Sequence, residues 1–101
     1  MTEAIVGAQA IDSLKRYNFT KGFFGANGVH RERGLTTPDI TEALVKEKAM
    51  EQCANRYVLA DSTKINQISS VTFAGFEEGM ILTTRLRDAS YKACKNILEV
   101  G

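Results

Sequence analysis

The sequence lacks several features that would assign the chain to a broad class of protein. It has no excess of charge of either sign, because 13 lysines and arginines stand against 12 aspartates and glutamates. This balance removes the electrostatic reason to propose a stand-alone nucleic-acid-binding or polybasic membrane-surface module. No apolar run approaches the roughly 18 residues of a membrane span, and no secretory signal is visible. We therefore expect a cytoplasmic chain without a membrane partner.

Metal ligands and cofactor motifs are scarce as well. The two cysteines, Cys53 and Cys94, form no CxxC or Cys/His pattern with the single histidine, His30. We therefore expect two free, buried thiols and no metal site. The glycines form neither a Rossmann GxGxxG pattern nor a Walker A loop, so we expect no nucleotide cofactor.

What the sequence does contain is typical of one small folded domain, or of a piece of a larger one. Of its 101 residues, 44% are apolar and 25% are charged, which is ordinary for a globular chain. The spacing of apolar residues predicts helices over 4–17, 38–55 and 90–96, and strands over 19–26, 57–60, 71–74, 80–84 and 97–100. Strands that alternate with helical segments predict an α/β fold with a mainly parallel sheet and flanking helices.

Local signals refine this outline. The adjacent Phe23 and Phe24 favour a strand that is buried on both faces. The segment 27–37 contains an Asn-Gly step and a second glycine, and we predict a loop there. Thr37 is expected to cap the central helix, with Pro38 in the first helical position.

The carboxyl ends of the predicted strands are the expected place of a ligand, because open α/β sheets bind their ligands there. Asn27 and Gly28 follow the first strand, where they form either a plain turn or a place at which backbone amides approach a ligand. Asp61 follows the second strand and Lys64 lies three residues further on. These two residues form either a helix cap with an exposed lysine or part of the same ligand-binding rim.

Two charged residues interrupt the apolar side of the central helix. Glu42 and Lys46 are four residues apart, in the order that favours an ion pair. They form either a salt bridge at the margin of the core or a pair that faces a polar cleft, where a carboxylate accepts from sugar hydroxyls and a lysine binds phosphate. The candidate ligand-binding residues are therefore Asn27, Gly28, Glu42, Lys46, Asp61 and Lys64.

Several short motifs, in this order, resemble the C-terminal sensor domain of DeoR-type transcriptional regulators. They are GANG at 25–28, GLTTPD at 34–39, Glu42-Ala43 followed by Lys46, and Asp-Ser-Thr-Lys at 61–64. The resemblance extends over nearly the whole chain, to about Thr84. The segments NRYVLADSTK and ISSVTF are most similar to the branch that represses lactose phosphotransferase operons in Gram-positive bacteria.

The resemblance implies a fold similar to ribose-5-phosphate isomerase, in a non-catalytic version that binds a phosphorylated sugar. For the lactose branch, an inducer like tagatose 6-phosphate is implied. In the isomerases, a glutamate and an Asp-x-x-Lys motif occupy places similar to Glu42 and to Asp61 with Lys64. Operator DNA would be bound only through an N-terminal winged helix-turn-helix. We therefore expect residues 1–101 to be a partial, homo-oligomeric effector-sensing domain, without the DNA-binding domain and the first part of the sensor domain.

Two other functions stay open on the sequence alone. A phosphosugar isomerase-like enzyme fragment would use Glu42 as its general base, although the segment NGVHRERG has fewer acidic residues than the isomerase pattern. A ligand-free structural or oligomerisation segment would instead hold Glu42 and Lys46 as an ion pair at the edge of the core.

Overall fold

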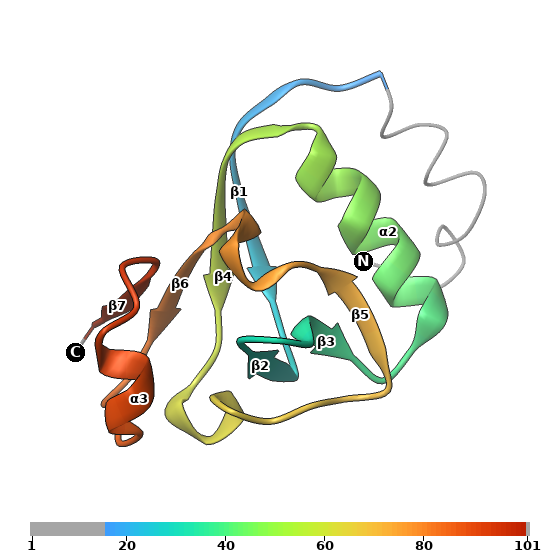
Figure 1. Cartoon of the computed structure of the whole chain (residues 1–101). Helices are drawn as coiled ribbons and strands as arrows, with labels where there is room; N and C mark the ends of the chain where they lie inside the picture. Colours follow the sequence, from blue (N-terminus) through green and yellow to red (C-terminus); the bar gives the residue numbers. More distant parts are fainter. Residues whose placement is uncertain (1–15, 101) are drawn as a thin grey trace.

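Four parallel strands form the main sheet of the protein, in the order β1-β4-β6-β7. The computed structural model describes residues 16–100, so nearly all of the helix predicted at 4–17 lies outside the described residues. The strands are β1 (Phe19–Gly25), β4 (Cys53–Leu59), β6 (Met80–Thr83) and β7 (Ile97–Glu99). Their arrangement confirms the predicted α/β fold with a mainly parallel sheet (Figure 1).

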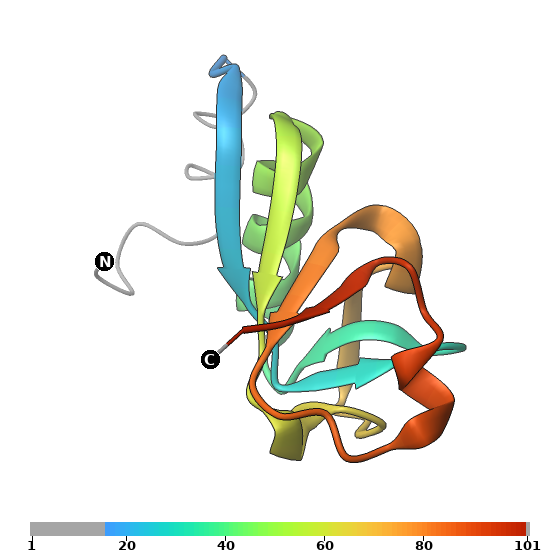
Figure 2. The same cartoon turned by 90° about the vertical axis from the view of Figure 1, so that its left-hand side faces the viewer.

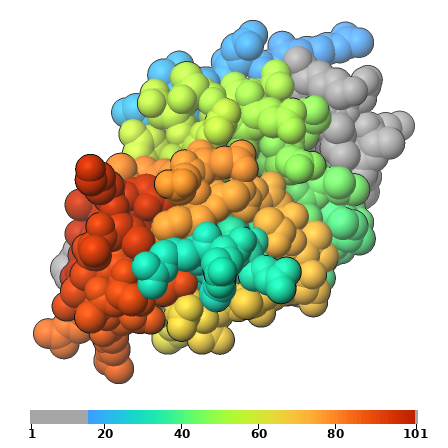
Figure 3. All heavy atoms as spheres, viewed as in Figure 1, coloured from blue at the N-terminus to red at the C-terminus, as the bar shows by residue number. Residues whose placement is uncertain are grey.

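A second, antiparallel sheet corrects the prediction of a loop at 27–37. Its order is β2-β3-β5, with the strands β2 (Gly28–His30), β3 (Gly34–Thr37) and β5 (Val71–Ala74). β2 and β3 form a hairpin whose turn leads into Gly34, at a φ of 81° that favours glycine. The turn signals in this segment therefore mark a short hairpin. Figure 3 shows this hairpin, coloured teal, on the same face as the red residues around α3.

The helices are shorter than the apolar periodicity predicts. α2 spans Ile40–Glu51, and Asp39 is its N-cap in place of Thr37, because the Asp39 carboxylate accepts from the amide of Thr41 at 3.1 Å. Thr37 is instead the last residue of β3. The helix is predicted to end at 55, but it ends four residues earlier because β4 already begins at Cys53.

The C-terminal part of the chain contains two 3₁₀ turns and one short α-helix. These elements are η2 (Ser62–Lys64), η3 (Phe76–Glu78) and α3 (Ala89–Lys92). α3 begins one residue before the predicted start at 90 and ends four residues before the predicted end at 96. Within residues 16–100, no helix is long and apolar enough to cross a membrane.

One apolar core joins both sheets to the helices. Side chains from every layer meet in it, among them Val29, Leu35, Met50, Val58 and Ile81, each at most 2% exposed. Figure 2 shows α2 along one side of β1 and β4. That side of the main sheet is therefore its buried face.

The opposite face of the main sheet remains apolar and accessible in the described part of the chain. Phe23 is 60% exposed and stacks on Tyr57 with 5.2 Å between ring centroids, whereas Phe24 packs against the core. The prediction that both phenylalanines are buried is therefore wrong, because successive residues of β1 point to opposite faces and α2 covers only one. Leu59 and Leu98 are also about half exposed.

The two cysteines are free, as predicted. Cys53 is buried and its thiol donates to the carbonyl of Ala49 at 3.2 Å. Burial raises the pKa of this thiol, and the positive charge of Arg56 partly opposes that shift. Cys94 is only partly buried, so the expectation of two buried thiols holds for one of them.

Candidate ligand site

Lys46 is the cation at the carboxyl end of β1. Its side chain leaves α2 and its Nζ donates to the carbonyl of Gly25 at 2.8 Å, 5.2 Å from the ring centroid of Phe73. Burial lowers the pKa of this ammonium, and the negative charge of Glu42 partly opposes the shift. Since an ammonium has three protons, the single bond to Gly25 leaves donors for an anion at this strand end.

Glu42 lies on the first turn of α2 and is exposed. No ion pair joins it to Lys46. Among the described residues, the ion pair that does form joins Lys48 and Glu51, at 2.7 Å on the same helix. The ion-pair alternative for Glu42 and Lys46 is therefore not what the structure shows.

The turn at 26–28 connects the two sheets. The amide of Ala26 donates to the carbonyl of Leu59 at 3.4 Å, and the amide of Asn27 donates to the carbonyl of Thr36 at 2.9 Å. The carboxamide oxygen of Asn27 accepts from the Thr37 hydroxyl at 3.3 Å, while the residue itself stays exposed. Gly28 is buried, and a Cβ at this position would collide with the carbonyl oxygen of Gln67, 2.6 Å away. A close approach between protein segments thus explains the glycine.

Asp61 follows β4 and caps the turn η2. Its carboxylate accepts from the amide of Thr63 at 2.9 Å and from the hydroxyl of the same residue. These two hydrogen bonds, of which the one from the hydroxyl has the larger effect, lower the pKa of the carboxyl group. Lys64 is the last residue of η2 and is partly exposed, with its amide bonded to the Asp61 carbonyl at 3.0 Å.

The structure brings most of the candidate residues to neighbouring strand ends. Gly25 pairs with Leu59 in the sheet, so the turns that follow β1 and β4 begin next to each other at the same edge of the sheet. The segment after Asp61 returns to the first turn, because the amide of Asn66 donates to the carbonyl of Val29 at 2.7 Å. Lys46, Asn27 and Asp61 are thus held at one edge of the main sheet. Among the described residues, Glu42 forms no hydrogen bond or ion pair with any of them, and it acts on Lys46 only through its charge.

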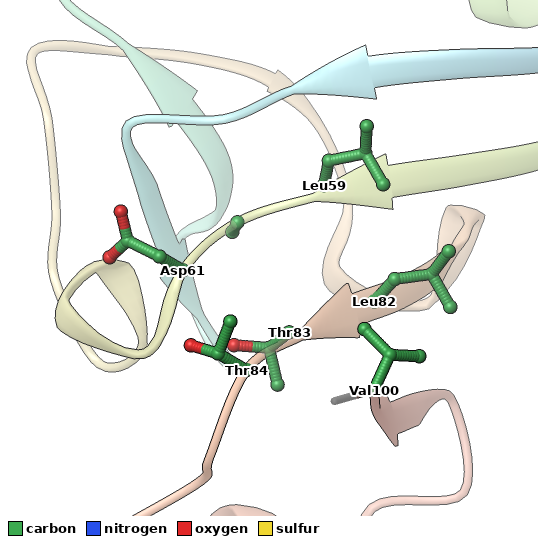
Figure 4. A pocket seen from close by; sticks show the side chains of 7 residues that line it. Leu59, Asp61, Leu82, Thr83, Thr84 and Val100 are labelled. Carbon is green, nitrogen blue, oxygen red and sulfur yellow. The ribbon is translucent and has the colours of Figure 1, made fainter.

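Two threonines at this edge were not singled out as ligand contacts from the sequence. A hollow of about 300 Å³ lies where β4, β6 and β7 end, with polar groups of Asp61, Thr83 and Thr84 and apolar groups of Leu59, Leu82 and Val100. Figure 4 shows the Asp61 carboxylate and both threonine hydroxyls on one side and the three aliphatic side chains on the other. Thr84 is the last residue of the strand predicted at 80–84.

A parallel sheet with a cation, a carboxylate and hydroxyls at its carboxyl rim is typical of an α/β domain that binds a small polar ligand. A family model described as the DeoR C terminal sensor domain matches residues 1–85. The chain belongs to this family, which confirms the resemblance seen in its motifs.

Relatives with DNA-binding regulator names support the same assignment. The uncharacterized HTH-type transcriptional regulator FruR of Bacillus subtilis is 44% identical over 90 residues, which are 89% of this chain and 36% of that protein. The HTH-type transcriptional regulator GlpR of Haloferax volcanii is 42% identical over 77 residues, or 76% of this chain and 30% of that protein. The lactose phosphotransferase system repressor of Staphylococcus epidermidis is 32% identical over 92 residues, which are 91% of this chain and 36% of that protein. The chain thus spans about a third of the length of these relatives.

Proposed function

We propose that this chain is the effector-sensing part of a DeoR-type transcriptional repressor of a sugar-utilisation operon, and that its effector is a phosphorylated sugar like tagatose 6-phosphate. The observation that carries the proposal is the ammonium of Lys46, which is fixed 2.8 Å from the last carbonyl of β1. A fixed cation at the rim of a parallel sheet suits a phosphate, and the carboxylate of Asp61 suits sugar hydroxyls. Asn27, Gly28, Glu42 and Lys64 frame the same rim.

The regulatory mechanism that we propose is a shift between two arrangements of the whole regulator. A phosphosugar that binds one arrangement more tightly favours that arrangement by its difference in affinity. Operator DNA would be bound by an N-terminal winged helix-turn-helix, and two of the relatives are named HTH-type transcriptional regulators. Residues 1–101 would then be one part of a cytoplasmic regulator, and the DNA-binding part and the first part of the sensor domain would precede them.

Self-association is a further part of what we propose. The main sheet leaves an accessible apolar face at Phe23, Leu59 and Leu98, and its edge strands β1 and β7 have free edges within the described residues. Such faces and edges favour pairing with another chain. Sedimentation equilibrium at several protein concentrations measures the oligomeric state, and a strictly monomeric chain would refute this part.

The test of the effector is calorimetric titration of the 101-residue chain with tagatose 6-phosphate, glucose 6-phosphate and inorganic phosphate. We expect a hexose phosphate to bind, and Lys46→Met to weaken its binding by at least about tenfold, since the variant keeps the aliphatic stem and loses the charge. Lys48→Met is the matched control, because Lys48 lies on the same helix and pairs with Glu51. It should leave the affinity unchanged within about twofold.

Two outcomes would exclude the proposed effector class. Failure of every hexose phosphate to bind would refute it, and so would equal losses of affinity in the Lys46 and Lys48 variants. The enzyme alternative has its own assay, because turnover of ribose 5-phosphate that Glu42→Gln abolishes would show an isomerase. Glu42 is exposed and forms no hydrogen bond with another described residue, which gives that alternative no support.

A further inference from the structure

The hydroxyl of Thr83 is a buried polar group without a partner. Thr83 is 2% exposed, and its Oγ1 accepts and donates no hydrogen bond within the part of the chain that the structure describes. The neighbouring Thr84 differs, since its hydroxyl accepts from the amide of Ser62 at 3.1 Å. Buried hydroxyl groups in folded proteins are nearly always paired, so the orphan at Thr83 calls for an explanation.

The position of Thr83 supplies that explanation. It is the last residue of β6, and it lines the hollow of about 300 Å³ at the carboxyl ends of the strands. Its backbone is held on the β7 side, because its carbonyl accepts from the amide of Val100 at 2.8 Å. A rotation of about 120° about χ1 brings the hydroxyl to the position of the methyl group, and the methyl group to that of the Cβ hydrogen, without moving this backbone. The hydroxyl can therefore turn to a molecule in the hollow.

The lining of the hollow defines the chemistry of that molecule. Most of its lining is aliphatic, from Leu59, Leu82 and Val100, and Asp61, Thr83 and Thr84 lie on its one polar side, as Figure 4 shows. No lysine or arginine lines it, so the hollow does not suit a phosphate group. A polyhydroxylated carbon chain, with hydroxyl groups on one side and C–H groups on the other, fits both sides.

We propose that Thr83 is a specificity-determining residue, whose hydroxyl binds a hydroxyl group of the sugar part of the effector while Asp61 accepts from another. This inference rests on the proposed function and deepens it. The sugar part occupies the hollow between β4 and β6, and the phosphate lies toward Lys46 at the end of β1. Discrimination between sugars of the same charge then depends on Thr83, while Lys46 provides the charge that all of them need.

The test compares Thr83→Val and Thr83→Ser in calorimetric titrations with tagatose 6-phosphate, glucose 6-phosphate and inorganic phosphate. Valine keeps the shape and removes the hydroxyl, so we expect roughly tenfold weaker binding of the hexose phosphate that the wild type prefers, the loss of about one hydrogen bond. Serine should restore the affinity to within a few-fold. Inorganic phosphate should bind equally to all three proteins. Thr20→Val is the matched control, since Thr20 is an exposed threonine on β1.

Each outcome decides the matter. If the wild type binds a hexose phosphate and Thr83→Val binds it equally well, the assignment of Thr83 is overturned and the proposed function stands. If the wild type binds no hexose phosphate, both are overturned. A thermal unfolding curve for each variant separates loss of binding from loss of fold, and a cooperative transition at or above the wild-type midpoint is expected for Thr83→Val.

Discussion

The two sheets of the molecule bury threonine side chains in opposite ways. In the antiparallel sheet, Thr36 and Thr37 are both fully buried, and both hydroxyls are paired: that of Thr36 accepts from the amide of Ser69 at 2.8 Å, and that of Thr37 donates to Asn27. In the parallel sheet, Thr83 is buried to the same degree and its hydroxyl is unpaired. Burial alone therefore does not separate a threonine that supports the fold from one that serves a ligand; the hydrogen-bond partner does.

The largest loss of stability is expected at Gly28 in the antiparallel sheet, where no space is left for a side chain. In Gly28→Ala, the added methyl group would collide with the Thr36 hydroxyl and with the carbonyl oxygen of Gln67, 2.6 Å away. We expect a loss of about 3 kcal/mol in the free energy of unfolding, because the backbone must shift. Urea denaturation measures it. Gly25→Ala is the control in the same turn, since no atom lies within 4 Å of its added Cβ. Equal stabilities of the two variants would contradict the close approach.

The next effect is expected for the paired hydroxyl of Thr36. Thr36→Val leaves the Ser69 amide without its acceptor, which costs about 1–3 kcal/mol of unfolding free energy. Hydrogen exchange at the Ser69 amide should accelerate in the same variant, and Thr36→Ser should recover most of the loss. A variant as stable as the wild type would show that the hydroxyl of Thr36 is dispensable.

A smaller effect is expected at Thr37. Its partner, the side chain of Asn27, is exposed, and the bond is long at 3.3 Å, so Thr37→Val leaves an amide oxygen that water can reach. We expect a loss of about 1 kcal/mol. Denaturation of the double variant with Asn27→Ala gives the coupling energy between the two residues, and a coupling near zero would remove this hydrogen bond from the comparison.

The smallest effect on stability is expected at Thr83. Thr83→Val breaks no hydrogen bond that the described residues make, so its free energy of unfolding should equal or exceed that of the wild type. Urea denaturation beside Thr36→Val is the direct comparison. A loss as large as that of Thr36→Val would show that the two sheets treat their buried threonines alike.

The fold could be predicted from the sequence where local signals and tertiary contacts agree. Continuous apolar segments such as YVLA at 57–60 and the β-branched and aliphatic residues at 80–84 identify strands of a parallel sheet, whatever lies around them. The hairpin at 28–37 could not be predicted in this way. Its strands are short and rich in glycine and threonine, and they form because β5 pairs with β3 and α2 packs against it, which no local pattern reveals.

The candidate site, too, could be predicted only in part. The rim at the strand ends follows from the parallel arrangement, and the charged residues that interrupt α2 draw attention to Lys46. The sequence could not show that Lys46 bonds to Gly25 while Glu42 faces solvent, because the two alternatives differ only in side-chain direction. Nor could it single out Thr83, which reads as an ordinary strand residue until the partners of its hydroxyl are counted.

The bond between Lys46 and the carbonyl of Gly25 has a spectroscopic consequence. A carbonyl that accepts from an ammonium is polarised, so the oxygen of Gly25 responds directly to whatever else competes for that charge. The chemical shift of a single ¹³C label at this carbonyl would then change when an anion binds. It would read the occupancy of the rim without a dye, a tag or a bound strand of DNA.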